Sequence, residues 1–392
     1  MLHSFLDFLF FVLSFTAQWH IAVTLLRAAR RRFPSMVVRL LAATFAVLGV
    51  LLAAAYIVGF AEIRGWLGLS LPNLGIVSGL AELWLLTASC AYGLHLLLRR
   101  ATRKIRFDPS RRRLLNSASG AVLASPFLVI GYGALVERTL FRVREVDIAI
   151  PGLHPDLVGL RLLQLTDIHL SPFLSVRELE RVIHAANETK PHLALVTGDL
   201  ISFPGDPLDE CLRLLATVKT DAGILGCLGN HEHYSKVEDY TAARAARLGM
   251  RFLRGQNQTL RFGAAALNVA GVDYERMSAT HSGYLRGAER MVVPGVLNML
   301  LSHNPDVFPT AAAQGYDLTV SGHTHGGQVN IEVLSQDINP ARFITPYVYG
   351  SYEWSGNGRR GAAYVSRGIG TIGIPARVGA PPEISVLRLR SS

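Results

Sequence analysis

The chain has 392 residues, half of them hydrophobic, and a formal net charge of +10. This length allows more than one domain, and so high a hydrophobic content indicates membrane spans rather than a wholly soluble protein. Residues 1–113 carry 14 Lys and Arg against 4 Asp and Glu, whereas the rest of the chain carries 25 of each. Because the excess charge lies between hydrophobic segments, it indicates membrane topology, and we expect no nucleic-acid binding.

Four apolar segments in the first third of the chain are long enough to cross a bilayer, which takes ~20 residues. The first and third connectors are rich in arginine, whereas the second contains only Arg64 beside Glu62. The positive-inside rule therefore predicts that everything after the fourth segment lies outside the cytoplasm. We expect residues 1–140 to form an all-α transmembrane region of about four helices, with spans at Phe5–Leu26, Met36–Phe60, Leu71–Leu98 and Leu114–Val136.

The stretch Ser110–Leu115, just before the fourth segment, reads Ser-Arg-Arg-Arg-Leu-Leu and resembles a twin-arginine export signal. The alternative is that these arginines are a plain positive anchor for a transmembrane helix, and both interpretations stay open. No clear small-x-small cleavage site follows, which favours retention of the segment as an anchor.

The remaining residues, 141–392, alternate strand-like and helical segments, which predicts an α/β domain. Its first strand is expected at Arg142–Ile150, where apolar and charged residues alternate. After Met250 the pattern changes to short strands separated by turns, which predicts a second sheet packed on the first and ending with Glu383–Arg388. Pro340–Gly358 is rich in Pro, Tyr and Gly, and we expect it to be a long loop near the mouth of the site.

Five short apolar runs of this domain end in polar residues that can bind metal. Because ligands of open α/β sheets bind at the carboxyl ends of the strands, we expect these endings to converge. Their carboxylate, amide and imidazole groups, without a thiolate, suit Mn, Fe or Zn better than a structural zinc site. The endings are Thr166-Asp167-Ile168-His169, Thr197-Gly198-Asp199, Gly229-Asn230-His231-Glu232, Ser302-His303-Asn304 and Ser-Gly-His-Thr-His-Gly-Gly-Gln at 321–328.

Together and in this order, the five endings resemble the calcineurin-like metallophosphoesterase superfamily over roughly residues 157–392. The Gly-His-Thr-His-Gly-Gly-Gln form is similar to its bacterial membrane-tethered phosphodiesterase branch. The resemblance implies a four-layer αββα sandwich over 141–392, two divalent metal ions (Mn, Fe or Zn) at the sheet edge, and His231 as the catalytic histidine. It assigns Asp167, His169 and His325 to the first metal, Asn230, His303 and His323 to the second, and Asp199 to both.

The implied activity is hydrolysis of phosphate mono- or diesters at the extracytoplasmic face of a membrane. A hydroxide that bridges the two metals would attack phosphorus in line, and His231 would protonate the leaving alkoxide. We expect a multi-pass protein of the bacterial cytoplasmic (inner) membrane, in contact with membrane lipids and acting on a phosphate ester linked to lipid or cell wall.

Two alternatives stay open. A nucleotide-lipid pyrophosphate hydrolase of the UDP-diacylglucosamine type also resembles this superfamily, but that reaction is cytoplasmic, so the arginine distribution disfavours it. A non-catalytic membrane sensor or scaffold is disfavoured by the complete set of predicted ligands.

Overall fold

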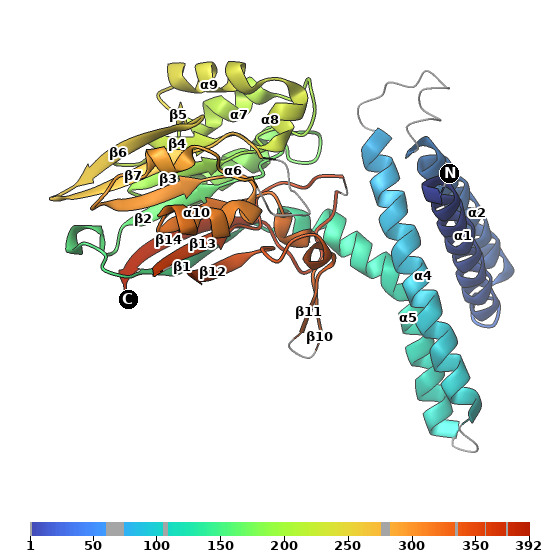
Figure 1. Cartoon of the computed structure of the whole chain (residues 1–392). Helices are drawn as coiled ribbons and strands as arrows, with labels where there is room; N and C mark the ends of the chain where they lie inside the picture. Colours follow the sequence, from blue (N-terminus) through green and yellow to red (C-terminus); the bar gives the residue numbers. More distant parts are fainter. Residues whose placement is uncertain are drawn as a thin grey trace. The chain divides into compact units, whose positions relative to one another are not determined.

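The computed structural model describes residues 2–59, 74–104, 109–275, 283–333, 336–356, 358–373 and 375–392. They fall into two compact units (Figure 1). The first unit comprises Met1–Leu135 with Gly373–Ala376, and the second comprises Val136–Ile372 with Arg377–Ser392.

The described residues of the first unit form four long helices, which overlap the four predicted spans. Its buried core joins Ile21, Ala88 and Leu123 from three of these helices. Among the described residues, two segments are long and apolar enough to cross a membrane, Ser35–Ala54 and Ser117–Thr139, so the number four stays a prediction. Phe60–Asn73, which holds the second predicted connector, lies outside the described residues. The helices are α1 (Leu2–Ala29), α2 (Ser35–Gly59), α4 (Leu74–Lys104) and α5 (Pro109–Leu135).

The second unit contains two six-stranded mixed sheets and a small hairpin. The first sheet, in spatial order, consists of β1 (Arg142–Ile150), β14 (Glu383–Ser391), β2 (Arg161–Leu165), β3 (Leu193–Thr197), β4 (Ile224–Cys227) and β5 (Arg251–Phe252). The second consists of β12 (Gly350–Gly356), β13 (Arg359–Val365), β9 (Leu318–Ser321), β8 (Leu297–Leu301), β7 (Ala265–Gly271) and β6 (Gln256–Phe262). The hairpin pairs β10 (Ile331–Val333) with β11 (Gln336–Ile338).

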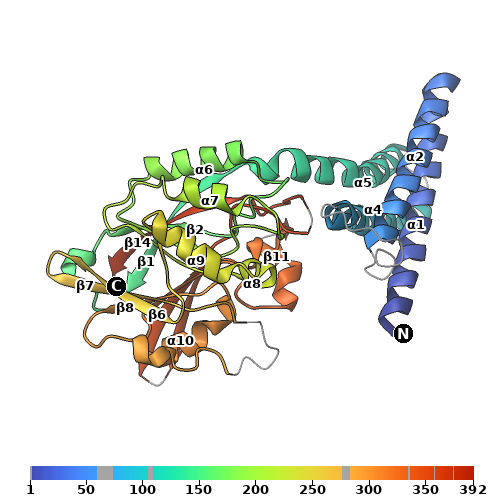
Figure 2. The same ribbon diagram turned by 90° about the horizontal axis from the view of Figure 1, so that it is seen from above.

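Helices cover both outer faces of the two sheets. In Figure 2, α6 and α7 lie on one side of the sandwich and α10 on the other. The α-helices of this unit are α6 (Val176–Glu188), α7 (Leu208–Leu215), α8 (Asn230–Ser235), α9 (Glu238–Arg247) and α10 (Phe308–Gln314). Short 3-10 turns complete it: η1 (Glu137–Thr139), η2 (Pro155–Leu157), η3 (Ala288–Met291), η4 (Pro305–Val307), η5 (His325–Gly327) and η6 (Pro340–Phe343).

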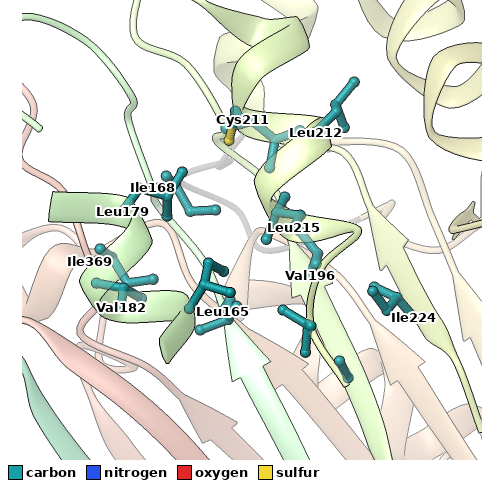
Figure 3. Packing of buried hydrophobic residues seen from close by; sticks show 14 of the residues in the cluster. Leu165, Ile168, Leu179, Val182, Val196, Cys211, Leu212, Leu215, Ile224 and Ile369 are labelled. Atoms are coloured by element: carbon teal, nitrogen blue, oxygen red, sulfur yellow. The ribbon is translucent and has the colours of Figure 1, made fainter. Parts of the chain in front are cut away.

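Helix α6 shows how the local sequence builds this arrangement. Ser175 and Glu178 form a capping box, in which each side chain accepts a hydrogen bond from the other's backbone N–H. Apolar residues three and four apart then give the helix one buried face. Figure 3 shows this face and that of α7 over the first sheet, with Leu179, Val182, Cys211, Leu212 and Leu215 beside Leu165 and Val196.

Strand β2 shows how the two sheets come together. Leu163 and Leu165 belong to the cluster under the helices, whereas Leu162 belongs to the cluster between the sheets. Gln164, two residues after Leu162, faces the second sheet as well. Its side-chain amide donates to the carbonyl of Ser321 there, at 2.8 Å. The predicted α/β sandwich of two sheets is therefore confirmed.

Two of the sequence-based expectations for this unit are wrong. Strand β14 does not join the second sheet; it lies in the first, parallel to β1 and antiparallel to β2. It fits an interior position because both of its faces are apolar, with Val386 in the cluster under the helices and Leu387 between the sheets. Residues Pro340–Gly358 are not one long loop, because β12 occupies Gly350–Gly356. In β12, Tyr352 and Trp354 alternate with more exposed residues and pack against α10.

Candidate metal centre and active site

The five predicted endings lie at one edge of the sandwich. Strands β2, β3 and β4 run parallel in the first sheet, as do β7, β8 and β9 in the second. The carboxyl ends of the strands in each sheet therefore point the same way. The loops and first helical turns after β2, β3, β4, β8 and β9 carry, in that order, Asp167 with His169, Asp199, Asn230 with His231, His303, and His323 with His325.

The side chains of these loops form two groups of possible metal ligands. Asp167, His169, Asp199 and His325 make one group, and Asp199, His303 and His323 make the other, with the donor atoms of each group within 4.8 Å of one another. Asp199 belongs to both groups, with its Oδ2 atom 3.5 Å from Nε2 of His169 and 3.1 Å from Nε2 of His303.

The amide of Asn230 adjoins the second group. Its Oδ1 atom lies 3.1 Å from Nε2 of His303, and Nδ1 of His323 lies at the same distance from that nitrogen. The structure thus brings together all seven of the predicted metal ligands. Carboxylates, an amide oxygen and imidazoles at this spacing are a donor set that fits divalent Mn, Fe or Zn.

The backbone of this centre is strained. Nine described non-glycine residues have positive φ, a conformation that only a few per cent of such residues adopt. Such a conformation costs about 1–3 kcal/mol at each position, and it persists only where the surrounding fold imposes it. Five of the nine are predicted ligands: Asp167 (50°), His169 (48°), Asp199 (56°), His323 (76°) and His325 (53°).

The surrounding hydrogen bonds orient the rings. Nδ1 of His303 donates to the carbonyl of Thr197 at 2.7 Å, which leaves Nε2 for the site. The backbone N–H of His323 donates to the carboxylate of Asp167 at 3.0 Å, and this bond ties the turn of one sheet to the loop of the other. Gly322 allows this approach, because a Cβ there would lie 2.3 Å from Oδ2 of Asp167.

Burial and charge set the protonation of the histidines. Burial lowers the pKa of His169 and of His323 to about 3 and also lowers the pKa of His325, so these rings are neutral and keep a lone pair for a ligand. Burial also opposes the charge of His303, but the carboxylate of Asp199 raises its pKa to about 9. His303 in turn outweighs burial at Asp199 and holds the pKa of that carboxyl well below its usual range. Asp199 is thus the carboxylate that favours a positive charge beside it, which a divalent ion can supply.

His231 lies beside the two groups of ligands and belongs to neither. Its ring is 4.8 Å from the ring of His169, centroid to centroid, and its backbone N–H donates to Oδ1 of Asp199 at 2.9 Å. Its Nδ1 atom donates to the carbonyl of Ser202 at 2.6 Å. This bond fixes the ring and makes Nε2 the nitrogen that can exchange a proton with a substrate.

Glu232, the next residue, supports the position of Asp199. Its buried carboxylate accepts hydrogen bonds from three backbone N–H groups, those of Asp199 (2.9 Å), Leu200 (2.7 Å) and Gly229 (2.8 Å). It thereby ties the loop after β3 to the loop after β4.

Sequence reasoning missed two residues that build this centre. Arg377 is fully buried and donates to the carbonyls of His325 at 3.3 Å, Arg367 at 2.8 Å and Ala380 at 3.0 Å. Tyr274 lies beside the second group of ligands, with its ring centroid 5.6 Å from that of His323. Neither residue stands in a motif, so only the folded arrangement identifies them.

Comparison with known proteins points to one family for residues 160–327. Residues 160–327 match the family model of the calcineurin-like phosphoesterases. The metallophosphoesterase YkuE of Bacillus subtilis is 29% identical over 291 residues, which cover 72% of this chain and 98% of that protein. The metallophosphoesterase Cj0846 of Campylobacter jejuni is 31% identical over 255 residues, and the match covers 63% of each chain, less than two thirds of the length of that relative.

A third relative combines such a domain with a membrane protein. The transmembrane protein with metallophosphoesterase domain of Bos taurus is 26% identical over 313 residues, which cover 76% of this chain and 68% of that protein. Together with the two apolar helical segments, this likeness supports association with a membrane. Residues 160–327 of this chain therefore form a domain that matches the calcineurin-like phosphoesterases, and the relatives support a metal-dependent phosphoester hydrolase.

Proposed function

We propose that this chain is a membrane-anchored phosphoesterase that uses two divalent metal ions to hydrolyse phosphate mono- or diesters outside the cytoplasm. The observation that carries the proposal is the place of Asp199 in both groups of donor atoms. Two ions ~3.5–4 Å apart, as in two-metal phosphatases, need a carboxylate that both can share.

In the proposed site, Asp199 would be shared by both ions, and the other ligands would divide between them. Two ions bound in this way would generate a nucleophile from water at neutral pH and offset the charge that develops on the phosphoryl oxygens. The ligands are Asp167, His169 and His325 for one ion, and Asn230, His303 and His323 for the other.

The proton for the leaving group comes from His231. Its Nδ1–H group donates to the carbonyl of Ser202, so the proton that can be transferred is on Nε2. Because the backbone N–H of His231 donates to Asp199, the acid keeps a fixed position relative to the carboxylate that both ions would share. A positioned acid of this kind is commonly worth ~10²–10⁴-fold in rate.

The proposed location is the cytoplasmic membrane of a bacterium. Residues 1–140 would anchor the chain through about four spans, and the arginine-rich connectors would put the phosphoesterase domain, residues 141–392, outside the cytoplasm. The proposed substrate is a phosphate ester of a lipid or a cell-wall polymer, because the anchor keeps the domain close to such molecules.

The test is hydrolysis of p-nitrophenyl phosphate and bis-p-nitrophenyl phosphate by the full-length chain in detergent, with and without Mn²⁺. We expect metal-dependent turnover and two ions per chain by elemental analysis. Asp199→Asn should lose both, whereas Asp221→Asn, at an exposed carboxylate on the same domain, should lose neither. Full metal content in Asp199→Asn would refute a shared carboxylate, and two bound ions without turnover of any phosphoester would favour a sensor.

A further inference from the structure

One turn of the second unit presents two large apolar side chains to solvent. Phe343 is 94% exposed and Ile344 is 72% exposed, the highest values among the described large apolar side chains of this unit. Arg342, immediately before them, is also exposed. The three residues stand at the end of η6 and are called the apolar tip below.

The apolar tip stands between two buried anchors. On one side, buried Asn339 caps η6, with its Oδ1 atom accepting from the backbone N–H of Ala341 at 3.0 Å. On the other side, the buried hydroxyl of Thr345 is hydrogen-bonded to the carboxylate of Asp306. Within the turn, the N–H of Ile344 donates to the carbonyl of Ala341 at 2.9 Å. The exposure of Phe343 and Ile344 is therefore imposed by a built turn.

The apolar tip is joined directly to the metal centre. The side-chain amide of Asn339 donates to the carbonyl of Gly326 at 2.8 Å, and Gly326 follows the predicted ligand His325. The packing is close, because a Cβ at Gly327 would lie 2.1 Å from Oδ1 of Asn339. A contact that restrains the apolar tip would therefore also restrain Gly326 and Gly327, which follow the predicted ligand His325.

We propose that the apolar tip inserts Phe343 and Ile344 into the lipid bilayer to which this chain is attached. The helices of the first unit keep the domain near a bilayer, so its effective concentration there is high. Arg342 beside the two apolar side chains suits the phosphate groups of lipid heads. The catalytic site then meets phosphoesters at the depth of the lipid headgroups.

A bilayer fits the shape of the apolar tip better than a protein partner does. A stable protein interface buries about 800 Å² on each side, whereas a single aromatic side chain buries about 150–250 Å². Two side chains on a convex turn fall short of such an interface. Acyl chains accept an isolated side chain without a complementary surface. The inference rests on the membrane association and is independent of the number of metal ions.

The experiment places a fluorescent label on the apolar tip of the full-length chain. In a Cys90→Ser background, Cys211 and Cys227 are fully buried and do not compete for label. Phe343→Cys is labelled with the environment-sensitive dye NBD, and Val158→Cys, at a 44% exposed residue of the same unit, is the matched control. Both are reconstituted into phosphatidylcholine vesicles, with and without phosphatidylglycerol, that contain a quencher attached to the acyl chains.

We expect blue-shifted emission and quenching by the lipids at position 343 and not at position 158. Quenching at 343 that is no stronger than at 158 in both lipid compositions would overturn the proposal. A blue shift at 343 without quenching would do so as well, because it would mean burial against protein. The double variant Phe343→Ser, Ile344→Ser should keep turnover of the soluble nitrophenyl ester within about twofold, which shows separately that the metal centre is intact.

Discussion

The substitution Gly229→Ala tests the geometry of the metal centre with a single methyl group. Gly229 lies between β4 and α8 with φ −99° and ψ −175°, an extended conformation that alanine adopts without strain. A Cβ there would lie 2.1 Å from Oδ1 of Asp199 and 2.6 Å from its backbone nitrogen. Ordinary contact begins at 3.4 Å, so the methyl group and the carboxylate must separate by about 1.3 Å, from 2.1 to 3.4 Å.

Displacement of Asp199 should lower both metal binding and turnover, because this carboxylate belongs to both groups of ligands. Misplacement of a catalytic group by 1 Å costs about 10²-fold in rate, and overpacking of a buried site costs about 1–3 kcal/mol of stability. We therefore expect Gly229→Ala to fold, to bind less metal and to lose about 100-fold in kcat/KM for bis-p-nitrophenyl phosphate.

Gly223, at the other end of β4, provides the matched control. Its φ is +88° and a Cβ there would meet nothing within 4 Å, so Gly223→Ala strains the backbone by about 1 kcal/mol and leaves the site untouched. Elemental analysis, turnover and urea unfolding of both variants separate the displacement of Asp199 from a general loss of stability. Wild-type metal content and turnover in Gly229→Ala, or equal losses in both variants, would refute the reasoning.

Three further predictions concern the same site. His231→Ala should lower kcat by about 10²–10⁴-fold without loss of metal; alkyl phosphates should suffer more than nitrophenyl esters, and an equal loss for both would exclude the acid role. Glu232→Gln should lower the free energy of unfolding in urea by about 1.5–3 kcal/mol, because one amide oxygen cannot accept all three backbone N–H groups; an unchanged midpoint would show that these bonds are dispensable. Removal of the ions by a chelator should lower Tm by about 5–10 °C, since ligand at 100 times its Kd adds about 2.7 kcal/mol; Mn²⁺ should restore the Tm, and a Tm insensitive to both would speak against a bound metal.

The sequence predicted the members of the site because their signals are local. Each stands within a few residues of a buried parallel strand, so the strand pattern alone predicts where Asp167 or Asp199 must lie. Arg377 gives no such signal, because its burial depends on carbonyl groups of residues such as Arg367 and Ala380 that the chain brings together only after folding. Strand β14 was misplaced for a related reason: its apolar pattern predicts a buried strand but does not say in which sheet.

The positive φ angles of the predicted ligands have a consequence for protein engineering. Glycine or asparagine fits this backbone region better than the histidines at 169 and 323 do. Substitutions that relax the backbone there should make the metal-free protein more heat-resistant while they inactivate it. A library selected for thermal stability alone should therefore accumulate inactive variants at these positions, and selection on this scaffold has to be coupled to turnover at every round.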